Sequence, residues 1–330
     1  MKTKIFIAAA AAAAVLVGCN KNQDTVTVRD ASSETAELSV SIPLEGQTKA
    51  SGTVSEVAEN TLASVQVFVF TDSGNLEAYK SATSGQLDLS CTKGNKTVAA
   101  LVNAPAVSDI TTLAELRAKT TALADNAAKS FVMYGQKAVP VNAASVSVTL
   151  EVQRFAAKVV IQKITNKMAL SQYQSSPVAI TGIYLINVAG NATLAGSGNP
   201  SLWLNRQKNE AAADCLYYEK PSALNVAYNS SESTGHYFYC YPNPTASDSA
   251  DEAWSPRHTR LVVEANVGGK KCYYPITLPV VNANTVYTIG ELTITRLGTD
   301  APDVETVMGS ASFTITVAPW KTENVDSVTI

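Results

Sequence analysis

Histidine is almost absent from this sequence, which has only two, His236 and His258, among its 330 residues. Neither has the near neighbours of a zinc motif, so we interpret them as a strand residue and a loop residue. The sequence also lacks a G-x-S-x-G elbow, a Walker loop and a dinucleotide-binding fingerprint. Asp248, Asp251 and Glu252 are close together but lack the ligand order of an EF-hand, which favours a solvated acidic loop over a calcium site. We therefore expect no enzyme, no metal and no cofactor.

Charge is sparse as well, because only 16% of the residues are Asp, Glu, Lys or Arg. The formal net charge is -3 and no run of Lys or Arg is present to follow phosphates, so nucleic acid is not expected as a partner. The body of the chain is rich in Val, Thr, Ser and Ala, which suits half-buried strands better than helices. We expect a mostly β protein.

Cysteine is also rare, with five in the chain. Four of them, Cys91, Cys215, Cys240 and Cys272, lie in the body and show no close paired spacing of a metal or redox motif. Export would let them oxidise, but small buried side chains on strands explain each of them at least as well. We predict no disulfide.

One long apolar run is present, from Ile5 to Val17, and two lysines precede it. It is shorter than the roughly 20 residues that cross a bilayer and is typical of a signal-peptide core. The run leads into LVGC, ending at Cys19, which resembles the lipobox of bacterial lipoproteins. We predict that residues 1-18 are a lipoprotein signal peptide, that Cys19 carries the lipid, and that the polar residues 19-35 are a tether.

A strictly alternating segment follows the tether. Its apolar positions, which indicate a strand with one buried face, are Ala36, Leu38, Val40, Ile42 and Leu44. Pro43 has no amide hydrogen, so we expect this strand at a sheet edge, or bonded on one side there. An exposed loop, EGQTKASGT, comes next.

Most of the remaining chain alternates in the same way, with one exception. Between Ser108 and Asn126 apolar residues recur at helical spacing, and Thr112 with Glu115 forms a capping box, which predicts a helix. Strands are expected near 64-70, 85-90, 96-103, 131-135, 145-152, 153-164, 179-188, 236-242, 259-267, 271-278, 285-298 and 311-320. This spacing fits two successive β-sandwiches, at residues 36-153 and 154-330.

Aromatic residues gather in the second half and allow two interpretations. A carbohydrate-stacking platform is one, but alternate strand residues face opposite sides, so we favour core packing for about half of them. The residues concerned are Tyr217, Tyr218, Tyr237, Phe238, Tyr239, Tyr241, Tyr273 and Tyr274.

Several motifs, in order along the whole chain, resemble the major fimbrial subunits (fimbrillins, type V pilins) of Bacteroidales. They are the lipobox, GQTKA after the first strand, VMYG, QRFAAKVVI, FYCYPNP, TRLVVEA, CYYPITL, NTVYTIGELTITRLG and VAPW. The resemblance implies two transthyretin-like β-sandwich domains in tandem with a few short helices, on a lipoprotein carried to the outer membrane surface.

The resemblance also implies assembly by strand exchange. A trypsin-like protease cuts such subunits after the first strand, and the C-terminal segment of another copy fills the vacated groove. The corresponding bond here is Lys49-Ala50, whereas the family's bond usually follows arginine. A broader trypsin-like enzyme, cleavage at Arg29, or an unprocessed anchor subunit are the alternatives that this departure leaves open.

The donor is expected within residues 311-330, where alternation resumes. Its apolar residues are Phe313, Ile315, Val317, Trp320, Val328 and Ile330, and Trp320 breaks the two-residue phase, which predicts a turn or bulge. The alternative is that residues 311-320 complete their own sandwich. We thus expect a shaft subunit whose partners are other copies and the anchor and tip subunits, with a tip adhesin or lipid-anchored glycan-binding protein as the alternative.

Overall fold

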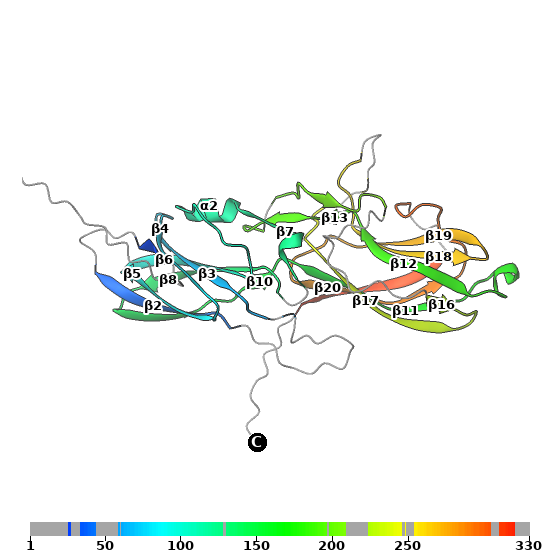
Figure 1. Ribbon diagram of the computed structural model, residues 1–330, viewed down its shortest axis with the longest axis horizontal. Helices are drawn as coiled ribbons and strands as arrows, with labels where there is room; N and C mark the ends of the chain where they lie inside the picture. The colour runs from blue at the N-terminus through cyan, green and yellow to red at the C-terminus, as the bar shows by residue number, and fades with distance from the viewer. Residues whose placement is uncertain are drawn as a thin grey trace, which may run out of the picture.

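The computed structural model describes residues 26-27, 34-43, 59, 61-127, 130-196, 198-208, 224-245, 248, 254-304 and 310-320. Strands dominate these residues, as the composition predicted, and form an elongated body (Figure 1). The strands up to residue 154, here called the N-terminal half, occupy one end, and those from residue 157, the C-terminal half, occupy the other. No helix in the described part of the chain is apolar over a length that would cross a membrane.

Two sheets form the N-terminal half. The larger has the order β1-β4-β3-β6-β8-β10, with β1 Val26–Thr27, β4 Leu76–Ala82, β3 Val65–Thr71, β6 Gly94–Val102, β8 Met133–Val141 and β10 Gln153–Arg154. The smaller has the order β5-β2-β9, with β5 Gln86–Thr92, β2 Thr35–Ser41 and β9 Ser145–Thr149. Their buried side chains belong to one hydrophobic core.

The edge position predicted for the first strand is wrong. β2 is the central strand of its sheet, antiparallel to β5 and parallel to β9. Pro43 lies beyond the last strand residue, Ser41, so its missing amide hydrogen interrupts no ladder. The alternation itself correctly predicted which side chains are buried.

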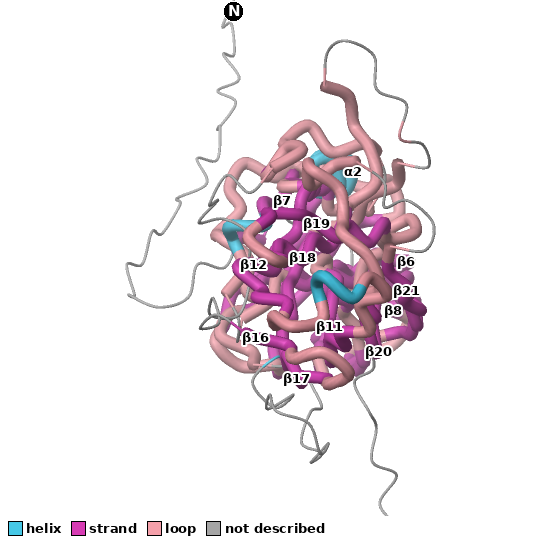
Figure 2. Tube along the Cα trace, turned by 90° about the vertical axis from the view of Figure 1, so that its right-hand side faces the viewer, coloured by secondary structure: helices cyan, strands magenta, loops and turns pink. Residues whose placement is uncertain are grey.

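The C-terminal half also has two larger sheets. One has the order β17-β11-β20-β21, with β17 Ser231–Cys240, β11 Ala157–Asn166, β20 Thr285–Ile294 and β21 Ala311–Pro319. The other has the order β16-β12-β18-β19, with β16 Leu224–Val226, β12 Val178–Ile186, β18 Arg260–Val267 and β19 Lys270–Thr277. The end-on view shows strands inside the body and loops around them (Figure 2). The arrangement is the β-sandwich class that the sequence predicted.

Two short sheets complete the fold. β13 (Val188–Ala189) pairs with β15 (Trp203–Leu204), and β14 (Asn191–Thr193) pairs with β7 (Thr120–Ala122), which joins the two halves. A buried hydroxyl supports the same junction, because Tyr241 accepts from Asn126 Nδ2 at 2.7 Å. The hydrophobic core runs continuously from one half to the other.

The predicted helix is much shorter than residues 108-126. α2 covers only Leu113–Ala118, with the expected capping box of Thr112 and Glu115. The residues after it form β7 and a 3-10 turn at Leu123–Asp125 instead, because pairing with β14 takes the chain out of the helix. A further 3-10 turn lies at Ser171–Tyr173. β4 was not predicted from the sequence, because its mixed composition hides its alternation.

The buried aromatic residues and His236 of the C-terminal half serve in packing rather than in an exposed binding surface. Tyr237, Tyr239, Tyr241 and Tyr274 are buried, which confirms core packing over an exposed stacking platform. His236 is a buried strand residue, and burial lowers its pKa. The cysteines at 91, 240 and 272 are buried thiols outside any disulfide among the described residues, while Cys215, Tyr217 and Tyr218 lie outside those residues.

Candidate functional site

The strand predicted to be removable, β2, lies between β5 and β9 with one face buried. Ala36, Leu38, Val40 and Ile42 are 3%, 0%, 0% and 4% exposed and form one row in the core. Leu38 lies opposite Leu89 of β5 and opposite Val146 of β9. Because β2 is bonded along both sides, its departure would leave two unpaired strand edges flanking an apolar groove.

Hydrogen bonds at the ends of β2 fix its position. The Glu37 amide donates to the Ala144 carbonyl at 2.8 Å, and the Ile42 amide donates to the Gly85 carbonyl at 2.8 Å. Gly85 approaches so closely that an added Cβ would lie 2.7 Å from the Ile42 carbonyl oxygen, so a larger residue there would push on the end of β2. The structure thus brings four of the five predicted strand residues together, and Leu44 lies outside the described residues.

The predicted donor residues separate into two environments. β21 is an edge strand, antiparallel to β20 on one side only. Phe313 is 39% and Val317 is 50% exposed, and Ile315 is half-buried. Their partners across the ladder, Leu292, Tyr287 and Ile289, are fully buried. The apolar side chains of β21 therefore lie on the same face of the sheet as the buried side chains of β20. At β21, however, nothing among the described residues covers that face completely.

Trp320, the next predicted donor residue, is held inside its own chain and is only 6% exposed. Its amide donates to the Asn284 carbonyl at 2.8 Å. Its ring stacks on Tyr239 at 5.7 Å between centroids and meets Phe131 edge-on at 5.3 Å. The Arg154 guanidinium lies 4.7 Å from the ring centroid, within range of a cation-π contact. The predicted turn is consistent with the end of β21 at Pro319.

Glu59 completes this cluster and was not identified from the sequence. Its carboxylate accepts from Trp320 Nε1 at 3.2 Å, from Lys158 Nζ at 2.7 Å and from the Tyr239 hydroxyl at 2.5 Å. Burial, followed by the negative charge of Glu59, raises the pKa of Tyr239, so its hydroxyl stays protonated and donates. Burial lowers the pKa of Arg154. Because Glu59 lies between β2 and β3 of the N-terminal half along the chain and these three partners belong to the C-terminal half, its carboxylate links the two halves at the junction.

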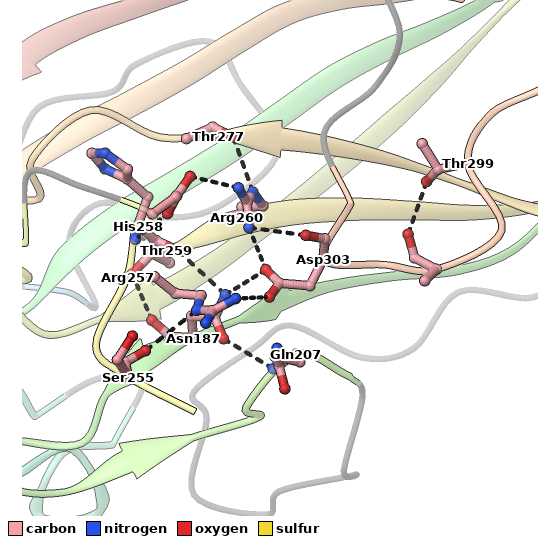
Figure 3. A network of polar contacts seen from close by, with 12 residues as sticks. Asn187, Gln207, Ser255, Arg257, His258, Thr259, Arg260, Thr277, Thr299 and Asp303 are labelled. Carbon is pink, nitrogen blue, oxygen red and sulfur yellow. Dashed lines mark hydrogen bonds and ion pairs between the residues drawn. The ribbon is translucent and has the colours of Figure 1, made fainter. Parts of the chain in front are cut away.

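A second charged cluster fastens the connection between β20 and β21 (Figure 3). Asp303 in that connection accepts from Arg257 Nη1 at 2.7 Å and from Arg260, whose side chain is 2% exposed. Asn187 Nδ2 donates to Asp303 at 2.8 Å. Arg260 also pairs with Asp248 at 2.5 Å, so this carboxylate of the predicted acidic loop is engaged by an arginine rather than left to the solvent.

A cleft of about 800 Å³ lies at the junction of the two halves. Its lining includes Arg117, Tyr134, Gln136, Arg154 and Asn191. Arg117 Nε and the Tyr134 hydroxyl both donate to Gln136 Oε1, at 3.0 and 2.9 Å. The polar groups on this wall of the cleft are therefore bonded to one another.

Several predicted site residues lie outside the described part of the chain. They are the lipidation residue Cys19, the cleavage residues Lys49 and Ala50, and the terminal donor residues Val328 and Ile330. Their assignments stay predictions. Lys49 and Ala50 fall between β2 and Glu59, the two features that the structure places in the core.

Comparisons with known proteins agree with the fold. No family model matches the chain, and no curated protein matches its sequence. Among solved structures, a candidate cell adhesion protein of Bacteroides eggerthii matches with a TM-score of 0.64 at 17% identity. The match covers 87% of this chain and 97% of the Bacteroides protein. The fimbrilin FimA of Porphyromonas gingivalis matches with a TM-score of 0.61 at 17% identity, covering 88% and 99%.

A third structure is the tip fimbrial protein Mfa3 of Porphyromonas gingivalis, with a TM-score of 0.53 at 11% identity, covering 87% of this chain and 100% of its own. The chain therefore has the fold of these fimbrial proteins over nearly their whole length. The resemblance drawn from the sequence motifs is confirmed at the level of the fold.

Proposed function

We propose that this protein is a structural shaft subunit of a surface fimbria. In this proposal it is exported as a lipoprotein through Cys19, cut between Lys49 and Ala50, and polymerised by donor-strand exchange at the cell outer membrane. The observation that carries the proposal is β2: a central strand with a fully buried apolar row, covalently joined to the body through the segment that contains Lys49.

The energetics of β2 explain why proteolysis would be needed. Burying a Leu, Val or Ile side chain contributes about 1.5 to 3 kcal/mol, so Leu38, Val40 and Ile42 together hold β2 with roughly 5 to 9 kcal/mol, an upper range. While the chain is intact, β2 also has the high effective concentration of a tethered strand. Cutting the tether removes that advantage, and a strand from another copy then competes on equal terms by β-augmentation.

The geometry of exchange favours a fibre. A subunit that accepts a strand at one surface and donates one from another makes a head-to-tail contact, which is open-ended unless the rotation closes a ring. We propose the donor within residues 311-330 and the division into two sandwich domains near residue 153. Neighbouring copies, anchor and tip subunits, and a trypsin-like protease are the partners; no catalytic role is proposed.

Deleting residues 321-330 tests this function. The truncated subunit should fold as a monomer, since a donor completes its neighbour's core, but should fail to elongate. Val328→Asp and Ile330→Asp should each block elongation, whereas Thr329→Asp is the matched control on the opposite strand face and should elongate normally. Fibres of normal length from the deleted subunit would refute the donor assignment.

A second function, glycan binding by a tip adhesin, depends on the cleft at the junction. Arg117, Tyr134 and Gln136 are the groups that would contact a sugar there. Their replacement by alanine should abolish cell attachment without changing fibre length if this function applies. The shaft role is preferred because a tip subunit accepts a strand but has no need of the apolar donor residues Val328 and Ile330 that the sequence predicts.

A further inference from the structure

The edge strand β21 is fastened to its own subunit before it begins. Asp303, in the connection from β20, is buried between Arg257 and Arg260, with Arg260 in β18 on the other sheet (Figure 3). The same connection pairs with β19, where Thr299 and Tyr273 exchange backbone hydrogen bonds at 2.9 Å in both directions. Moving this connection would take the carboxylate of Asp303 away from the buried Arg257 guanidinium and leave Arg260 with Asp248 alone, which is costly in a low-dielectric interior.

β21 is fastened again immediately after it ends. Trp320 is 6% exposed between Tyr239, Phe131 and Arg154, and its amide is bonded to the Asn284 carbonyl. Its ring contacts groups from both halves of the molecule, so extracting it would open the junction as well as empty a pocket.

A hydrogen bond to Glu59 also holds Trp320 in its pocket. The buried carboxylate, 2% exposed, accepts the indole hydrogen bond together with those of Lys158 and Tyr239. Loss of Trp320 would remove one of its donors in a place that water does not readily reach. A tryptophan held by stacking, cation-π and hydrogen-bond contacts is a fixed point of the chain.

We infer that β21 stays on its own subunit during assembly and that the strand donated to a second copy begins after residue 320. Trp320, held by its hydrogen bond to Glu59, is the last residue that stays in place. This inference rests on the proposed function and narrows it. The exposed row of Phe313 and Val317 is then presented on the outside of each subunit, next to the donated segment, rather than inserted into a neighbour.

A reversible lock on β21 tests the inference. Thr288 of β20 and Thr316 of β21 lie opposite each other in the ladder and are not buried, so Thr288→Cys with Thr316→Cys places two thiols across the pair. Cys91, Cys240 and Cys272 are buried, and the variant is made with Cys215→Ser to leave one accessible pair. Each single-cysteine variant is the matched control, because it cannot form the bridge within a subunit.

The processed subunit, residues 50-330, should elongate at the same rate whether this bridge is oxidised or reduced. If oxidised subunits remain monomers and a reductant restores elongation, β21 must leave, and the inference is overturned while the proposed function stands. If neither the unmodified nor the reduced subunit elongates, the proposed function itself has failed.

Amide hydrogen exchange gives a second measurement on the unmodified protein. A strand that stays at the edge keeps one free side, so the amide exchange rates of residues 311-318 should be the same in monomers and fibres. Transfer of β21 into the groove of a neighbour would pair it on both sides, and a large loss of exchange across these residues would overturn the inference.

Discussion

Leu38→Ala and Leu89→Ala together separate the roles of β2 and β5. The two leucines lie opposite each other, and both are buried, at 0% and 2% exposed. Truncating a buried leucine to alanine costs about 2 to 5 kcal/mol through lost transfer free energy and the cavity left behind. In the uncut subunit, both variants should therefore lower the free energy of unfolding by a similar amount in urea.

The two variants should differ in the temperature at which their fibres dissociate. In the proposed fibre β2 is absent, so Leu38→Ala fibres should dissociate on heating at the wild-type temperature. Leu89 stays in the groove and contacts the donated strand, so Leu89→Ala fibres should dissociate at a lower temperature. If Leu38→Ala weakens the fibre as much as the uncut subunit, β2 is still present and the reasoning about exchange is refuted.

Three further predictions follow from particular side chains. Cys19→Ser should abolish lipid labelling and membrane fractionation; unchanged incorporation would contradict the lipobox assignment. Trp320→Ala should lower the free energy of unfolding by about 3 to 5 kcal/mol in a denaturant titration, and an unchanged midpoint would show that the junction does not depend on it. Burial raises the pKa of Glu77, but hydrogen bonds from Lys96 and Thr92 outweigh it and lower that pKa overall. Stability from this group is therefore present at neutral pH and lost as the pH falls through the folded-state pKa, so Glu77→Gln should flatten the acid side of the stability profile, and a profile as steep as the wild type would count against this role.

Local alternation was sufficient to predict burial in β2, but not its place in the sheet. A period of two says which side chains face the core, and Leu38 and Val40 are buried as expected. Which strands pair with β2 depends on β5 and β9, which come from distant parts of the sequence. Pro43 therefore suggested an edge that the structure does not have.

The helix shows how tertiary pairing overrides a local signal. The capping box at Thr112 fixed the start of α2 correctly, because its hydrogen bonds are local. Thr120 and Leu123 continued the helical spacing, yet β7 forms there because β14, some distance along the chain, pairs with it. Spacing alone carries no information about that partner.

The junction cluster could not be found from sequence at all. In the sequence, nothing in the residues next to Glu59 distinguishes it from a solvated carboxylate. Its burial arises because Lys158, Tyr239 and Trp320 converge on it from three separate segments. The only trace in the sequence was the phase break at Trp320, which correctly marked the end of a strand.

The mass and N-terminal sequence of subunits from shed fibres test the central proposal most directly. Donor-strand exchange predicts that these subunits begin at Ala50 and contain no peptide from residues 34-43. Fibres built of subunits that begin at Cys19 or Asp30, and so retain β2, would contradict it.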